Sequence, residues 1–157
     1  MLPETAKRAN LQGSLKRFFK DNLQEGQNIH VSFDKLLTTP TVGGEKLVEW
    51  VGVKIGENDL DLMATQIIEV FCCTREDYEG YRLSRLRDQV LGLLTNAGGS
   101  TDTICRIPLY AVAESVADWE RVGAFMVAEI NESEEMEAPD LTKFITLSLR
   151  LRYASGV

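Results

Sequence analysis

Residues 141–153 read LTKFITLSLRLRY, and their alternation of apolar and polar side chains points to the fold class of this chain. Side chains alternate between the two faces of a strand. One face would carry Ile145, Leu147, Leu149, Leu151 and Tyr153, and the other Thr142, Thr146, Ser148, Arg150 and Arg152. The pattern predicts a strand with one face in the core and one in solvent, as in a sheet covered by helices on one side.

Two segments have helical spacing instead. In residues 5–23 apolar side chains recur three or four positions apart, at Leu11, Leu15, Phe18, Phe19 and Leu23, with Lys7, Arg8, Lys16, Arg17 and Lys20 among them. In residues 77–95 the predicted apolar stripe is Tyr78, Leu83, Leu86, Val90, Leu93 and Leu94, with Arg82, Arg85, Arg87 and Asp88 outside it. Both segments are predicted to be amphipathic helices packed on the sheet.

The remaining strands are predicted from β-rich runs bounded by turn residues. These runs are residues 28–33, 46–55, 62–74, 103–113 and 123–131, with a turn at 56–59. Residues 35–45 contain Pro40 and the pair Gly43-Gly44, so we expect an irregular exposed loop there. The order α-β-β-β-α-β-β-β favours a single α+β domain over residues 1–157, two-layered, with an antiparallel or mixed sheet and both helices on one face.

The composition and the net charge limit the classes of function that the chain is expected to have. The chain has 157 residues, 44% of them hydrophobic, and a net charge of −7, which argues against a nucleic-acid binder. Its three cysteines, Cys72, Cys73 and Cys105, do not form a disulfide framework and favour a reducing compartment. The amino terminus lacks the apolar core of a signal peptide, and no apolar run reaches bilayer length, so we expect neither export nor a membrane span.

The residue types that carry chemistry are sparse. The single histidine, His30, falls on the polar side of its predicted strand, and the neighbouring Cys72 and Cys73 would point to opposite faces as small core residues. The glycine-containing run 96–101 follows a helix instead of leading from a strand into one, so a helix stop is expected there and not a phosphate loop. The sequence therefore predicts no catalytic residue, cofactor or metal.

An acidic cluster precedes the last strand and comprises Glu132, Glu134, Glu135 and Glu137. It lacks the alternating Asp/Asn ligands and central glycine of a calcium loop. Two interpretations remain open. The cluster is a solvated hairpin tip, or it meets a basic surface of a neighbouring copy, for which the candidates are Arg82, Arg85, Arg87, Arg150 and Arg152.

The order of elements resembles the tail terminator proteins of long-tailed bacteriophages. The resemblance covers nearly the whole chain. It rests on the N-terminal helix, the strand ending in Phe33, the Pro/Gly loop, the strand TQIIEVF at 65–71, the link DYEG at 77–80 before the second helix, and the alternating last strand. None of these features is a catalytic or ligand signature.

The resemblance implies a structural virion protein without enzymatic activity. It implies a closed homo-oligomeric ring, typically of six subunits, that caps the tail tube, halts its polymerisation and joins the tail to the head connector. The implied partners are other copies of the chain, the tail tube protein and the connector or stopper protein, with DNA only as cargo in the lumen and no membrane. The implied location is the host cytoplasm during assembly and then the tail or neck of the virion.

The predicted subunit-interface residues come from the Pro/Gly loop, the second helix, the acidic cluster and the last strand. They are Pro40, Gly43, Gly44, Arg82, Arg85, Glu132, Glu134, Glu135, Glu137, Arg150 and Arg152. The nearest alternative is another neck or head-to-tail joining protein. Two others remain: a small intracellular enzyme or ligand-binding domain using Asp34, Glu69 and Arg106, and an adaptor that adds a strand to a partner.

Overall fold

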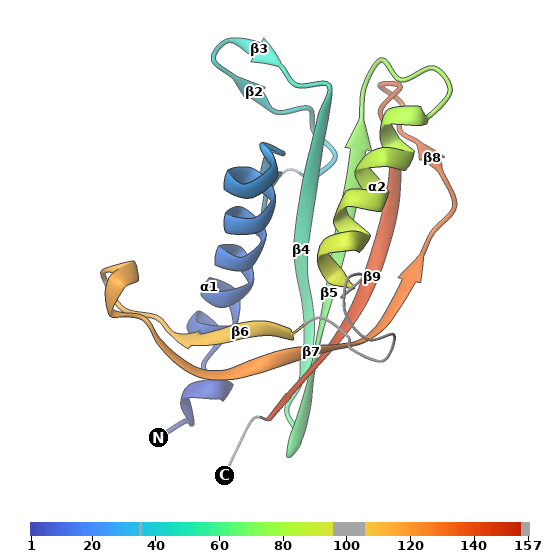
Figure 1. The fold of residues 1–157 in the computed structure, drawn as a ribbon. Helices are drawn as coiled ribbons and strands as arrows, with labels where there is room; N and C mark the ends of the chain where they lie inside the picture. Colours follow the sequence, from blue (N-terminus) through green and yellow to red (C-terminus); the bar gives the residue numbers. More distant parts are fainter. Residues whose placement is uncertain (35, 96–105, 155–157) are drawn as a thin grey trace.

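The chain folds as an α+β protein, as the sequence predicts (Figure 1). The computed structural model describes residues 1–34, 36–95 and 106–154. The helical elements are the 3-10 turn η1 (Glu4–Ala6), α1 (Arg8–Phe19), its π-helical continuation η2 (Lys20–Glu25), α2 (Tyr81–Leu94) and the 3-10 turn η3 (Val116–Asp118). The strands are β1 (Val31–Ser32), β2 (Thr41–Val42), β3 (Glu45–Lys46), β4 (Glu49–Asp59), β5 (Met63–Thr74), β6 (Arg106–Ala111), β7 (Glu120–Glu132), β8 (Met136–Glu137) and β9 (Lys143–Ala154).

The first helix follows the predicted apolar stripe. Leu11, Leu15, Phe19 and Leu23 occur every fourth residue and are all buried, because residues four apart on a helix share one face. The stripe continues from α1 into η2. The predicted strand at 28–33 is shorter than expected: Asn28 has a φ of 56°, and the Ile29 amide donates to the carbonyl of Leu23. The chain is still completing the helix end there, so that β1 is limited to Val31–Ser32.

The second helix confirms most of its predicted stripe. Leu83, Leu86, Val90 and Leu94 are fully buried. Tyr78, which the spacing also assigned to the stripe, is 92% exposed. It lies before the helix, which begins at Tyr81 after Gly80 adopts a left-handed φ of 76°. The helical period therefore does not extend back to residue 78.

The sheet is mixed and strongly curled. Its main path is β1-β4-β5-β9-β7-β6, with β8 added beside β9. Among the described strands of this sheet only β1 and β4 pair in parallel, and the other pairs are antiparallel. The first half of β7 pairs with β6 and its second half with β9. Because of this change of partner, β6 and the start of β7 run across the other strands (Figure 1). Helix α1 packs on β6, and helix α2 packs on β5.

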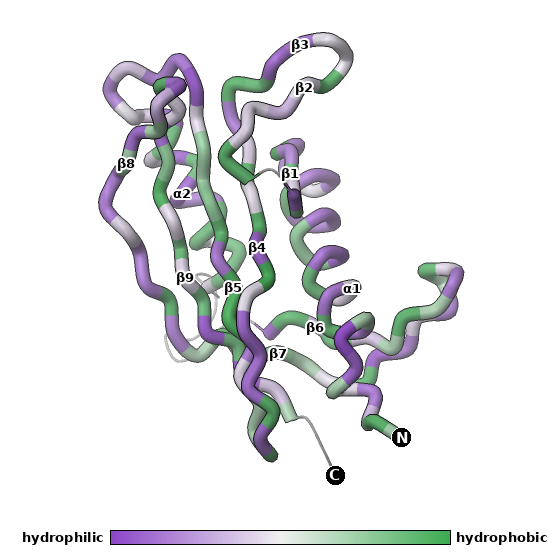
Figure 2. The backbone as a smooth tube through the Cα atoms, turned by 180° about the vertical axis from the view of Figure 1, so that it is seen from behind, coloured by the Kyte–Doolittle hydropathy of each residue, from purple (hydrophilic) through white to green (hydrophobic). Residues whose placement is uncertain are grey.

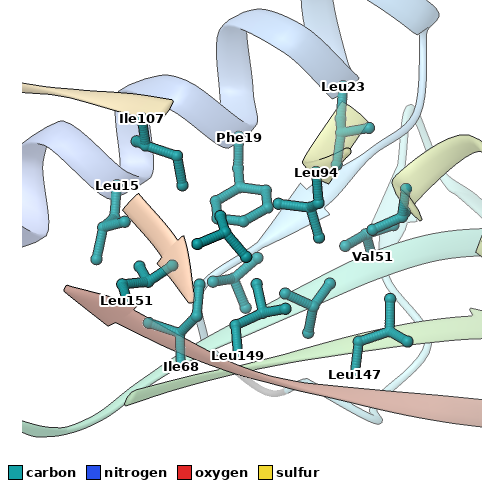
Figure 3. Packing of buried hydrophobic residues seen from close by; sticks show 14 of the residues in the cluster. Leu15, Phe19, Leu23, Val51, Ile68, Leu94, Ile107, Leu147, Leu149 and Leu151 are labelled. Carbon is teal, nitrogen blue, oxygen red and sulfur yellow. The ribbon is translucent and has the colours of Figure 1, made fainter. Parts of the chain in front are cut away.

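Both helices contribute to one hydrophobic core. Leu15 and Phe19 of α1 and Leu94 of α2 point toward the same side chains of the sheet (Figure 3). In β9 the inward residues are those that the alternation predicts, including the almost fully buried Leu149. The predicted alternation fails only at Thr142, expected in solvent, which is fully buried with no hydrogen-bond partner for its hydroxyl among the described residues.

The turn predicted at residues 56–59 is instead a β-bulge. Strand β4 continues to Asp59, and its register with β5 shifts between Ile55 and Asn58. The buried side chain of Gln66 donates to the carbonyls of Gly56 and Glu57 at 3.0 and 3.1 Å. A buried amide that satisfies the bulge carbonyls lets the strand pass through a sequence that favours a turn.

A second, smaller packing site lies on the opposite face of the sheet. After β1 the chain crosses this face and places Leu36 over Gly52 and Trp50 of β4. The indole N–H of Trp50 donates to the carbonyl of Leu36 at 3.0 Å. A Cβ on Gly52 would lie 3.1 Å from that same carbonyl oxygen and from the Leu36 Cβ. Trp50 and the neighbouring Cys73 are fully buried as a result.

Replacement of Gly52 by alanine tests this packing. We expect Gly52→Ala to lower the free energy of unfolding by about 1–3 kcal/mol, because a Cβ there overpacks against the backbone of residue 36. The matched control is Gly92→Ala in α2, where a Cβ meets nothing within 4 Å, and which should stabilise by about 0.4–1 kcal/mol. Urea unfolding measures both, and a neutral Gly52→Ala would show that residue 36 does not press on the sheet.

Candidate functional site

The predicted 35–45 loop contains a regular hairpin, which corrects the expectation of irregular structure. Strands β2 and β3 pair with each other and, within the described chain, with no third strand. Their turn is Gly43-Gly44, with φ values of 63° and 83°. Positive φ at both central residues is the turn geometry that matches the twist of a two-stranded hairpin, and glycine adopts it without strain.

The hairpin projects from the body of the protein. It stands clear of the sheet beyond the end of α1 (Figure 1), and its four strand residues are exposed. The Leu47 amide donates to the Pro40 carbonyl and closes its base. Val42 is 51% exposed although it is apolar. An isolated two-stranded hairpin is marginally stable in water, so this element has the character of a contact surface.

The arginine candidates on α2 differ in their surroundings. The guanidinium of Arg82 donates to the backbone carbonyls of Arg75, at 2.8 Å, and of Glu76. It therefore stabilises the loop that precedes α2. Arg85 is exposed and forms no ion pair with another described residue.

Glu132 forms an ion pair within its own subunit. Its two carboxylate oxygens accept from Nε and Nη2 of Arg87 at 2.9 and 2.6 Å. The paired guanidinium lowers the pKa of Glu132, and the same hydrogen bonds raise the pKa of Arg87. This bidentate pair joins α2 to the end of β7, so neither charge is simply available to a neighbouring copy.

The acidic cluster is not the tip of a hairpin, which corrects that interpretation. The turn before β9 lies at residues 138–141, where the Leu141 amide donates to the Ala138 carbonyl. The cluster runs earlier, between β7 and β8, along the side of β9. Glu135 lies 3.8 Å from the ammonium of Lys143, whereas Glu134 and Glu137 are exposed and have no basic partner among the described residues.

The last two interface candidates lie on the outward face of β9. Arg150 is 3.7 Å from Glu129 of β7, and both side chains are half exposed. Arg152 is exposed and makes no ion pair with the rest of the described chain. The predicted interface residues are thus spread over the hairpin, α2, the β7–β8 edge and β9, and the structure does not gather them into one site.

The residues of the enzyme alternative are also separate. Asp34 follows β1 at one edge of the sheet, Glu69 is in the middle of β5, and Arg106 begins β6 at the other edge. The two described cysteines are buried, and burial raises the pKa of Cys72 to about 12 and also raises that of Cys73. Such thiols stay protonated and are poor nucleophiles.

His30 and the glycine-containing run 96–101 are the residues that bear on a metal or phosphate site. His30 is partly buried, at the side of a groove near the base of the hairpin. Within the described residues no group of three or more His, Cys, Asp or Glu side chains could hold a metal ion. The glycine-containing run 96–101 and Cys105 lie outside the described residues.

One groove was not anticipated from the sequence. It has a volume of about 440 Å³ and is lined mainly by residues before α2 and before β9, among them Tyr78, Leu141 and Asp77. Leu141 is 69% exposed and has a φ of 67°, which is rare for a leucine. The helical spacing places Tyr78 on the apolar stripe of the second helix, so the sequence does not predict a groove here.

No family model matches the sequence, and no curated protein matches it. Neither α1 nor α2, nor any other helix of the described chain, combines the length and hydrophobicity needed to cross a bilayer.

Asp77, on the wall of the groove, fixes the start of α2. Burial alone would raise its pKa, but the amides of Leu83 and Arg82 and the hydroxyl of Thr74 donate to its carboxylate. Together they lower the pKa of Asp77 below its ordinary value. Its folded-state pKa is depressed, so its contribution to stability is present above about pH 4 and is lost as the pH falls through the folded value.

Replacement of Asp77 by alanine should therefore destabilise the protein by about 0.5–2 kcal/mol at pH 7, as the loss of a helix cap does. The difference from the wild type should shrink as the pH falls below about 4, because the carboxyl of the unfolded chain takes up a proton there before that of the folded protein does. Thermal unfolding at several pH values measures this, with Glu79→Gln, an exposed neighbour, as the control. Equal losses in both variants would rule out the capping role.

Proposed function

We propose that the chain is a structural subunit that self-associates into a closed ring, caps a phage tail tube, stops its polymerisation and joins it to the head connector. The proposal combines the resemblance of the sequence to tail terminators with the α+β fold. The observation that carries it is the β2–β3 hairpin. It projects from the body, exposes Val42 and pairs with no other strand of the described chain.

Assembly of this kind needs complementary surfaces and no reactive group. The shifted pKa values described above have structural explanations: Arg87 and Glu132 form a pair, Asp77 caps α2, and the two cysteines are buried. The net charge of −7 would also keep a lumen wall from retaining DNA that passes through it.

A second candidate is an adaptor that binds one different partner. It is favoured by the groove of about 440 Å³ with Tyr78 and Leu141 exposed at its walls. Exposed apolar side chains beside a groove often mark a binding surface. The two candidates differ in the behaviour of the pure protein: a ring subunit associates with itself, and an adaptor stays monomeric until its partner is added.

Substitution in the hairpin tests the ring. We expect the wild type to form closed rings in light scattering and negative-stain electron microscopy, and Val42→Asp to impair them. The reason is that a charge would have to be desolvated where an apolar side chain meets the neighbour. The thermal stability of the subunit should stay unchanged, since Val42 is 51% exposed. Tube-capping by each protein can be scored on tails polymerised in its presence.

The matched control is Leu62→Asp, at an exposed residue of the β4–β5 turn at the far end of β4 from the hairpin. It should assemble normally. A wild-type chain that is monomeric at every concentration would contradict the ring and favour the adaptor. Equal loss of assembly in both variants would mean that the hairpin has no special part in it.

A further inference from the structure

The exposed face of α1, together with the flanking residues Lys7 and Lys20, is basic in an acidic protein. Residues 7–20 contain Lys7, Arg8, Lys16, Arg17 and Lys20 and no acidic residue, while the whole chain carries a net charge of −7. Within the subunit Lys7 pairs with Glu4, and Arg17 pairs with Asp21 and stacks on Tyr110 at 4.4 Å. Part of the positive charge of this helix is thus neutralised locally.

Besides Arg8, the positive charges here without an acidic partner in the described chain are Lys16 and Lys20. Both are exposed, and neither forms an ion pair with a described residue. Their ammonium groups lie 5.7 and 5.9 Å from the centre of the Phe33 ring, which holds them together at the surface. Two like charges four residues apart on a helix repel each other. An external carboxylate would relieve this repulsion.

The complementary charge lies in residues 129–140. This segment contains Glu129, Glu132, Glu134, Glu135, Glu137 and Asp140 and no basic residue. Basic side chains of the same subunit contact three of the six acids: Arg150 contacts Glu129, Arg87 contacts Glu132 and Lys143 contacts Glu135. Glu134 and Glu137 remain exposed, without a basic partner among the described residues.

These two charged surfaces lie on opposite sides of the subunit. In Figure 1 the helix α1 is at one side and β8 at the other, with α2 between them, and the reverse view in Figure 2 shows the same separation. The chain around β8 is strongly hydrophilic in Figure 2. One subunit cannot bring its own two surfaces together, but two copies in head-to-tail contact can.

We propose that the basic face of α1, centred on Lys16 and Lys20, docks on the acidic 129–140 segment of a second copy, centred on Glu134 and Glu137. This inference rests on the proposed self-association and names its interface. Two different patches in contact make a heterologous interface, which repeats from copy to copy and closes into a ring when the rotation permits. Arg82, Arg87 and Arg150 contribute little, since all three already have internal partners.

A second copy explains both surfaces, whereas nucleic acid would explain only one. A phosphate backbone could lie on Lys16 and Lys20, but the acidic segment and the net charge of −7 would repel it. Binding of an oligonucleotide is accordingly kept as an outcome of the test.

The test is a charge reversal on each surface. Lys16→Glu with Lys20→Glu, and separately Glu134→Lys with Glu137→Lys, should each raise the concentration of half-association by about tenfold or more in sedimentation velocity. An equimolar mixture of the two variants should restore association, because each reversed surface then meets its opposite on the other chain. Wild-type association should weaken in about 1 M salt, where the screening length is only about 3 Å.

Two controls separate this interface from general charge effects. Lys54→Glu with Arg106→Glu makes the same charge change at exposed positions of β4 and β6 that belong to neither proposed surface, and should associate like the wild type. Thermal melts should show that all the variants keep the fold. Fluorescence anisotropy with a labelled oligonucleotide measures binding of nucleic acid to the wild type and to the lysine variant.

The outcomes are distinct. A wild-type oligomer that both reversals leave intact, or that the mixture fails to restore, overturns this interface but leaves the proposed ring. A monomeric wild type overturns both proposals. Oligonucleotide binding that disappears only with Lys16→Glu and Lys20→Glu, while association is unchanged, assigns the basic face to nucleic acid and overturns the inference.

Discussion

The pairing of β5 with β9 is the constraint on which the rest of the structure depends. Met63–Thr74 and Lys143–Ala154 pair residue for residue without a bulge, whereas β4, β6 and β7 all form irregular pairs. The unbroken register places Ile68 opposite Leu149, and their inward faces lie in the core to which both helices contribute. A shift by one residue would turn every core side chain of a strand to solvent.

Patterns that repeat along the chain were predictable, and single contacts between distant segments were not. The four-residue spacing from Leu11 to Leu23 and the alternation of β9 determine their own buried faces, and both predictions are confirmed. The course of residue 36 over Gly52, and the Gln66 amide that turns a predicted turn into a bulge, depend on tertiary packing. Local sequence carries no signal for either. The Gly43-Gly44 pair, in contrast, is typical of a hairpin turn. The hairpin could therefore have been predicted from the sequence, and the expectation of an irregular loop was wrong.

The candidate surfaces show a similar division. The sequence identified the acidic cluster and the basic residues of α1, because runs of one charge are visible in one dimension. It could not tell which charges are already paired. In the folded chain Arg87 binds Glu132 and Arg82 binds backbone carbonyls, so the most obvious arginines act within the subunit. Lys16, Lys20, Glu134 and Glu137 remain on opposite sides, together with an exposed hairpin, and these features support the proposal of head-to-tail assembly.

Zero-length cross-linking tests this account most directly. A carbodiimide joins a lysine to a carboxylate only when the two are in contact, and mixing isotopically light and heavy chains shows whether the link joins two copies. The account predicts mixed-isotope peptides that join Lys16 or Lys20 to Glu134 or Glu137, formed in low salt and lost in high salt. Links between copies that consistently involve other surfaces, or only links within one chain, would contradict it.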